Sequence, residues 1–259
     1  MSSEPTFEQA AANLRDAYIG LGSAIVGARM VEGPGFRGIS SSMRHAVGNF
    51  AVAEGADRTT AFELWRVARE APRFHAYLPC PNSDVDDREL LDRGFSSINE
   101  LLIMGTGSVA LGRTERPLSL IRLDSSELRE VGAELISRVF FSHLPPATRD
   151  QLTRLNAVNP HVVALGAWEA LASKTYRNIV GTLTLQMSQE CCGIYNLCIE
   201  PWLRNQGFGK ALVAKVANSE VVAGRPLVLQ CSADLQAWYQ LLGFRELGRV
   251  RIYAFGDSA

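Results

Sequence analysis

The run at residues 204–210, Arg-Asn-Gln-Gly-Phe-Gly-Lys, constrains what this chain can fold into more than any other stretch. The apolar residues 194–199 before it are predicted as a buried strand, and residues 211–217 after it as a helix. Gly207 and Gly209 let the backbone approach a ligand closely, and the free N–H groups of a helix's first turn bind anions. The arginine and the lysine at the ends of the run add positive charge. The sequence therefore predicts a strand, a phosphate-binding turn and a helix in succession.

A second strand and a second helix follow this unit. Residues 227–231 are predicted as a strand, and residues 234–242 as a helix whose end carries Tyr-Gln-Leu-Leu-Gly-Phe at 239–244. The order of strand, phosphate turn, helix, strand and Tyr-x-x-x-Gly-Phe resembles the GNAT acetyltransferase family. The resemblance extends over roughly residues 117–255, and the ordered pair of motifs is more specific than either motif alone.

This resemblance implies that the chain binds acetyl-CoA, or another acyl-CoA, as a co-substrate. In the family the pyrophosphate lies on the backbone amides of the turn, and the pantetheine arm pairs like an extra strand with the splayed end of the preceding strand. Pro201, close behind that end, fits the splaying because proline cannot donate to a strand ladder. The cofactor-binding residues that the resemblance implies are Leu197, Cys198, Ile199, Arg204, Asn205, Gln206, Gly207, Phe208, Gly209 and Lys210.

Tyr239 is the candidate catalytic residue. Attack of an amine on a thioester expels a thiolate, and a phenol beside the sulfur can protonate that thiolate as it leaves. The alternative interpretation is that Tyr239 only fills the interface between helix and sheet, like its neighbour Trp238. The resemblance favours the general acid, since the tyrosine four residues before Gly-Phe faces the sulfur in the family.

The general base is not assigned by the sequence. Several members of the family carry a glutamate near the start of the strand before the phosphate turn, and Gly193 stands at that position here. Glu190, the phenol of Tyr195, His161 or a chain of water molecules could accept the proton instead. An amine that arrives neutral needs only a path for its proton.

The N-terminal half is predicted to contain a second, degenerate copy of the same unit. Residues 59–71 are predicted as a helix, 73–78 as a strand, 86–93 as a short helix that runs into Gly-Phe, and 98–104 as a strand. The glycine of this Gly-Phe pair, Gly94, lies 149 residues before Gly243, and the same offset superimposes the longer helices of both halves. The alternative is that Gly-Phe recurs by chance between unrelated α/β units.

The same offset places Leu90 where Tyr239 stands, and residues 54–58 where the phosphate turn stands. Because this segment lacks paired glycines and brings acidic side chains to the position of an anion, the first copy is expected not to hold CoA. We therefore predict a degenerate GNAT-like domain at 1–110 and a catalytic, acyl-CoA-binding domain at 111–259, joined by a glycine-rich linker that starts at 105. Residues 33–38 are expected to form a loop that could cover the acceptor site.

The remaining periodic segments complete the predicted fold. Strands are predicted at 117–123, 162–170, 179–187 and 249–255, and helices at 125–140 and 146–156. The predicted fold class is α/β (α+β): a mixed, mostly antiparallel, twisted sheet flanked by helices on both faces, in two tandem copies.

Composition limits the cellular role. The formal net charge of −1 gives no general attraction to nucleic acid or to an anionic membrane. The five cysteines form an odd set without Cys-x-x-Cys, which indicates buried free thiols in a reducing cytoplasm. Adjacent Cys191 and Cys192 point to opposite faces of a strand, so no metal site is expected. The uncharged residues 17–28 are too few to span a bilayer, and their acidic leader does not resemble a secretory signal.

Two functions from different classes follow from these observations. The first is an N-acetyltransferase that moves an acetyl or short acyl group from CoA to the primary amine of a small molecule, with Tyr239 as general acid. The second is a non-catalytic module that binds acyl-CoA and regulates a partner through its N-terminal half. The first is preferred because Tyr239 and the phosphate turn are both present. A cytoplasmic protein that could pair as a homodimer is expected, and neither the acceptor nor the acyl preference follows from the sequence.

Overall fold

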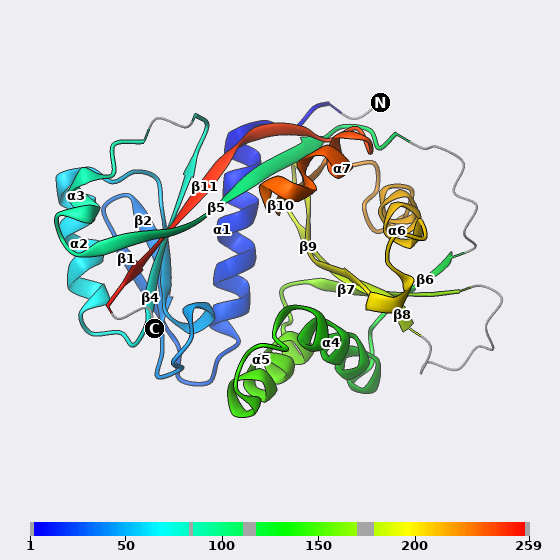
Figure 1. Cartoon of the computed structure of the whole chain (residues 1–259), viewed down its shortest axis with the longest axis horizontal. Helices are drawn as coiled ribbons and strands as arrows, with labels where there is room; N and C mark the ends of the chain where they lie inside the picture. Colours follow the sequence, from blue (N-terminus) through cyan, green and yellow to red (C-terminus); the bar gives the residue numbers. More distant parts are fainter. Residues whose placement is uncertain (1–2, 83–84, 111–117, 170–178, 257–259) are drawn as a thin grey trace.

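The computed structural model describes residues 3–82, 85–110, 118–169 and 179–256, which fold around one sheet of eleven strands (Figure 1). The strand order along the sheet is β1-β2-β3-β4-β11-β5-β10-β9-β8-β7-β6. The strands are β1 (Arg29–Gly33), β2 (Phe36–Ser40), β3 (Phe50–Ala53), β4 (Phe74–Cys80), β5 (Phe95–Thr106), β6 (Leu118–Arg122), β7 (Val163–Glu169), β8 (Ile179–Met187), β9 (Cys192–Ile199), β10 (Leu227–Cys231) and β11 (Arg245–Phe255).

Helices cover both faces of this sheet, as the sequence predicts. The helices are α1 (Phe7–Ser23), α2 (Arg58–Ala68), α3 (Arg88–Leu91), α4 (Ser126–Phe140), α5 (Pro146–Val158), α6 (Phe208–Ala217) and α7 (Gln236–Gln240), with 3₁₀ turns at Ala46–Gly48, Pro201–Leu203 and Ala233–Leu235. Among the described strands only β3–β4 and β9–β10 pair in parallel. The mixed, mostly antiparallel class is therefore confirmed.

The two halves exchange strands at the centre of the sheet. β5 belongs to the N-terminal half but lies between β10 and β11, whereas β11, the last strand of the chain, lies between β4 and β5. The antiparallel ladder between β5 and β11 extends from the pair Phe95–Phe255 to the pair Gly105–Arg245. Each half therefore places its last strand inside the sheet of the other. The segments on the two sides of the predicted boundary at 110/111 are joined by the ladders β4–β11, β11–β5 and β5–β10.

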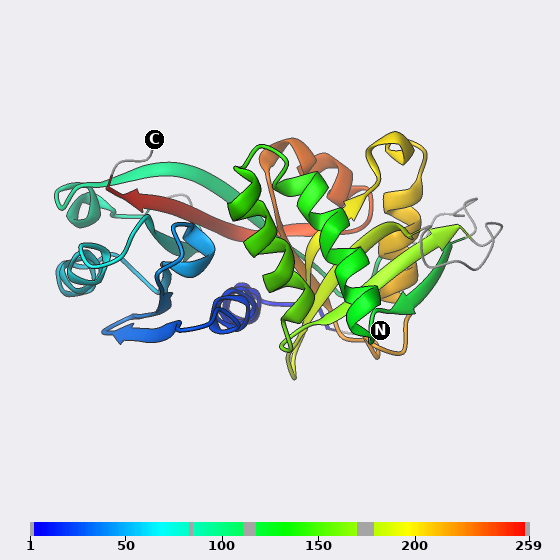
Figure 2. The same cartoon turned by 90° about the horizontal axis from the view of Figure 1, so that it is seen from below.

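Helix α1 holds the two halves together from one face. Its start is fixed by a capping box, in which the Thr6 hydroxyl accepts from the Gln9 amide and the Gln9 side chain accepts from the Thr6 amide. Figures 1 and 2 show α1 between the halves. Its buried Ala10 and Leu14 pack in one cluster with residues of β5, β10 and β11. Nothing in the sequence of this segment predicted its central position, because its partners lie on strands far away in the chain.

The internal repeat is visible element by element. The offset of 149 superimposes α2 on α6, α3 on α7 and β5 on β11 within a few residues. Gly94 and Gly243 both adopt a left-handed backbone, with φ of 87° and 90°, so the same turn geometry ends both short helices. Recurrence of Gly-Phe by chance does not account for a match of this length.

Residues 33–38 do not form the expected loop. They contain the end of β1, the turn Pro34-Gly35 and the start of β2, because Gly35 (φ 70°) allows a tight reversal between two strands. The turn contacts α2, where the Thr60 hydroxyl donates to the Pro34 carbonyl at 3.1 Å. The prediction of a loop over residues 33–38 was therefore wrong for all of them except Pro34 and Gly35.

Other boundaries differ by smaller amounts. Gly105 lies inside β5 rather than in a linker, and the helix expected at 234–242 is a 3₁₀ turn followed by α7. Gly112, Pro117 and the charged turn between β7 and β8 lie outside the described residues. All five cysteines are free and buried, as expected. No helix of the described chain is long and apolar enough to cross a membrane.

Cleavage between residues 110 and 111, at an inserted protease site, is expected to leave the two fragments associated. Gel filtration should show one species of unchanged size, because the β5–β11 ladder joins them. Either fragment expressed alone should be insoluble or unfolded, since it exposes unpaired strand edges. Separation of the cleaved fragments without denaturant would contradict the exchanged topology.

Candidate functional site

The candidate site forms where β9 leaves β10. The two strands pair only from Cys192–Leu227 to Ile194–Leu229. Directly afterwards the ladder of β9 with β8 shifts register, and Asn196 takes a left-handed backbone with φ 52°. The Asn196 amide donates to Asn156 of α5 at 3.2 Å and to Thr184 of β8 at 3.3 Å, which fixes this bulge. The bulge bends β9 away from β10 and opens the edge of β9 that faces it.

The predicted pantetheine residues lie on this open edge. Leu197, Cys198 and Ile199 follow the bulge, and β8 pairs with the other edge of β9 through Thr182–Cys198 and Gly181–Ile199. The Cys198 side chain packs in the cluster beneath α4, and burial raises the pKa of its thiol to about 12. Its sulfur is therefore a neutral packing group, and only the backbone of this residue is available to an extended ligand.

The predicted phosphate turn ends in an uncapped helix terminus. Gly207 is the N-cap of α6 with φ 83°, and no side chain caps the helix. Asn205 also has a left-handed backbone, with φ 60°. Gly209 faces α7, because a Cβ there would stand 3.3 Å from the Trp238 ring. Arg204 is exposed and Lys210 half-buried, so both positive charges lie beside a helix terminus that itself favours an anion.

The equivalent terminus in the N-terminal half is already filled by a carboxylate. Asp57 is the N-cap of α2 and accepts from the amides of Thr59 at 2.9 Å and Thr60 at 3.2 Å. The Thr60 hydroxyl donates to its second oxygen at 2.6 Å, and these hydrogen bonds lower the pKa of Asp57. A phosphate at this terminus would have to displace an internal anion. This geometry supports the expectation that the first copy does not hold CoA.

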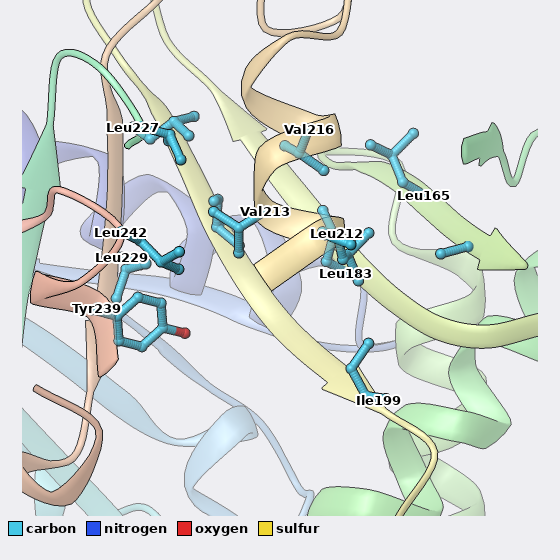
Figure 3. Close-up of a cluster of buried hydrophobic side chains, with 14 of the residues drawn as sticks. Leu165, Leu183, Ile199, Leu212, Val213, Val216, Leu227, Leu229, Tyr239 and Leu242 are labelled. Atoms are coloured by element: carbon cyan, nitrogen blue, oxygen red, sulfur yellow. The ribbon is translucent and has the colours of Figure 1, made fainter. Parts of the chain in front are cut away.

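Tyr239 lies at the inner end of the candidate site. Its side chain is 6% exposed and packs edge-on against Trp238 and Phe244. Figure 3 shows its hydroxyl pointing from α7 toward β9. Burial and the nearby Cys231 raise the pKa of the phenol, so it carries its proton at neutral pH, the form that a general acid needs. The ring of Tyr239 can therefore pack in the core while its hydroxyl serves as a proton donor. Leu90, its counterpart in the first copy, is buried and has no ionisable group.

Gly193 is a glycine because α1 occupies the space beside it. A Cβ at Gly193 would overlap the Asn13 side-chain oxygen and stand 2.6 Å from the Tyr195 ring. Asn13 is 1% exposed and donates from its amide nitrogen to the Gln186 carbonyl at 3.0 Å. Its oxygen accepts from the Tyr195 hydroxyl at 2.9 Å. An asparagine of the N-terminal half therefore fills the place where the resemblance would put a glutamate.

The structure does not gather the other base candidates into one site. Glu190 is exposed in the turn between β8 and β9, and His161 is exposed and packs against Gly20 of α1. Burial raises the pKa of Tyr195 well above its ordinary value, and its proton is donated to Asn13. Asn13, Asn156 and Asn196 were missed by the sequence analysis. No local pattern identifies them, since their partners lie far away in the sequence.

Gly193→Ala is expected to destabilise the protein by about 1–3 kcal/mol, because the added methyl group overpacks a site locked by hydrogen bonds. The same change in an Asn13→Ala background should cost less, since the colliding oxygen is gone, with a coupling of about 1 kcal/mol or more. Urea unfolding of the four proteins of this cycle measures both quantities. Additive effects within about 0.5 kcal/mol would show that Asn13 does not enforce the glycine.

Comparison with known proteins agrees with this geometry. Residues 167–246 match the family model described as an acetyltransferase (GNAT) domain. No curated protein matches the chain significantly. The structure is similar to a GCN5-related N-acetyltransferase from Kribbella flavida, with a TM-score of 0.66, 13% identity, and coverage of 96% of each chain.

Two further solved structures extend the likeness over both halves. A functionally unknown conserved protein from Staphylococcus epidermidis gives a TM-score of 0.62 at 13% identity, over 90% of this chain and 96% of the other. A tandem GNAT protein from the clavulanic acid biosynthesis pathway gives 0.52 at 12% identity, over 99% and 98%. The predicted resemblance and the tandem fold are thereby confirmed.

Proposed function

We propose that the chain is an acyl-CoA-dependent N-acyltransferase that moves an acetyl or short acyl group to the primary amine of a small molecule. The observation that carries this proposal is the uncapped N-terminus of α6, directly behind the splayed end of β9. The family match supports acyl transfer from CoA in general. The small acceptor and the role of Tyr239 are the finer parts of the proposal.

The residues present fit a bound acyl-CoA. The amides at the start of α6 and the charges of Arg204 and Lys210 would hold the pyrophosphate. The open edge of β9 from Leu197 to Ile199 would hydrogen-bond the pantetheine arm as an added strand. When bound, the co-substrate supplies the acyl group as a thioester. The buried apolar cluster around Tyr239 excludes water from the reacting sulfur.

In the proposed reaction the neutral amine forms the new C–N bond and the C–S bond breaks. Tyr239 donates its proton to the departing thiolate and is reprotonated from solvent. The proton of the amine leaves through water, because Asn13 rather than a carboxylate stands beside Gly193. Asn196 and Asn156 provide polar groups near the bulge that can orient such water.

A regulatory acyl-CoA-binding module is the second candidate, because the expected glutamate is replaced by Gly193. Release of free CoA in the presence of a panel of small amines would distinguish the two functions. Turnover with any amine supports the transferase, whereas tight acyl-CoA binding without turnover favours the module. Cytoplasmic location, homodimer formation and lack of nucleic-acid binding remain predictions.

Gly207→Val should weaken CoA binding by about a hundredfold or more, since two charge-assisted hydrogen bonds of about 1.5–3 kcal/mol each are lost. Calorimetry should find one CoA per chain in the parent protein and none in this variant at the same concentrations. Gly224→Val is the matched control, because Gly224 also has positive φ (72°) and its Cβ would meet open space. Both variants bear the same backbone strain of about 1–2 kcal/mol. Equal CoA affinity in both would remove the turn from the site.

Tyr239→Phe is expected to lower kcat by about 10²-fold when acyl transfer limits the rate, with CoA affinity nearly unchanged. The phenylalanine ring keeps the packing against Trp238 and Phe244, and only the proton donor is lost. Tyr77→Phe, which removes a phenol from the N-terminal half, serves as the control. A loss of less than about threefold, measured in single turnovers, would make Tyr239 a packing residue.

A further inference from the structure

An open cleft of about 640 Å³ lies between the two halves. One wall is the end of α1 and the loop after it, which contribute Ile25, and a second wall is the loop at residues 42–44. The third wall is α5, through Gln151, Arg154 and Leu155. Figures 1 and 2 show α5 beside the end of α1. The N-terminal half thus builds two of the three walls, and the cleft exists only because the halves are joined.

The charge of this cleft is unbalanced. Arg44 and Arg154 both line it, and its described lining residues include no aspartate or glutamate. Within the described chain neither guanidinium has an ion pair or a hydrogen bond from its side chain. Two unpaired arginines beside apolar side chains are the groups that bind a carboxylate or a phosphate on an apolar body.

A further cation, Arg73, acts on the residue that follows Arg44 in the chain. Burial, together with Arg73 and His143, lowers the pKa of His45, the neighbour of Arg44 in the chain. Burial, His45 and Arg73 lower the pKa of His75 to about 4. Besides burial, the groups that lower these two pKa values are the guanidinium of Arg73 and neighbouring imidazoles. Both imidazoles are neutral at pH 7, and the arginines supply the charge.

The cleft lies close to the proposed reaction centre. Leu155 lines the cleft, and the next residue of the same helix, Asn156, accepts the hydrogen bond from Asn196 at the bulge of β9. A helix with its side chains is about 10–12 Å across. A small molecule anchored in the cleft is therefore within about one helix diameter of the edge where the thioester would lie.

We propose that this cleft binds the acceptor, and that the acceptor is a small primary amine that also carries a carboxylate or a phosphate. Its oxyanion binds between Arg44 and Arg154, and its apolar part lies against Ile25 and Leu155. The proposal rests on the proposed function only in naming the bound amine as the acyl acceptor. The N-terminal half then contributes acceptor specificity, although its own anion site is filled by Asp57.

The test compares three ligands that share one body: 6-aminohexanoate, 6-aminohexyl phosphate and 6-aminohexanol. Ligand-observed NMR on the full chain at millimolar ligand measures binding without CoA. At least one of the two anions should bind at least about tenfold more tightly than the alcohol, and which anion binds better distinguishes carboxylate from phosphate. Arg44→Gln and Arg154→Gln should each weaken anion binding about tenfold, as expected for one charged hydrogen-bonding partner. Arg149→Gln, on the same helix but outside the cleft, should have no effect.

Several outcomes would overturn the proposal: no binding by either anion, equal binding of the alcohol, or unchanged anion binding by both arginine variants with intact folding by circular dichroism. Free CoA release with the bound anion tests the proposed function separately. Binding without release by any amine contradicts the transferase and leaves the anion-binding cleft in place. Release with other amines, but no anion dependence, contradicts the cleft and leaves the transferase in place.

Discussion

The ladder between β5 and β11 is the interaction on which the rest of the molecule depends. A strand edge must be paired, covered or charged to stay soluble, and β4 and β10 would each end a half-sheet without the strand supplied by the other half. β11 pairs with β4, β5 pairs with β10, and β5 and β11 pair with each other, so these four strands depend on one another. The position of β10, and hence the point where β9 departs from it, is therefore set by β5, whose paired residues lie 121 to 129 positions earlier in the chain.

Helix α1 adds a second dependence of the site on the N-terminal half. It places Asn13 against Gly193 and Tyr195, so the sheet face opposite α6 is filled by an amide and a phenol that satisfy each other. A buried hydrogen-bonded pair of this kind costs little, whereas a buried carboxylate there would need a partner that balances its charge. The position of α1 thus explains why a glycine, and not a glutamate, stands at position 193.

Much of the fold could be predicted because its signals are local. The apolar runs at Ile179–Met187 and Leu227–Cys231 are strands over those residues, and Ser125 caps α4 as expected. The strand, turn and helix around Gly207 also follow one another as predicted, with Gly207 as the N-cap of α6. The exchange of strands could not be predicted, because nothing in the composition of β5 says which half it joins. The role of Asn13 escaped for the same reason: its partners Tyr195 and Gln186 are distant in the chain and meet it only after folding.

The exchanged strands also bear on how this chain can assemble. Two separate copies that exchanged their last strands in this way would form a twofold dimer. This chain carries an interface of that kind inside itself. Its central edges are no longer available to another copy, so any homodimer must form elsewhere, with β1 and β6 as the outermost strands of the sheet. Because this interface is internal, the N-terminal half can form walls of the cleft while Asp57 occupies its own helix terminus.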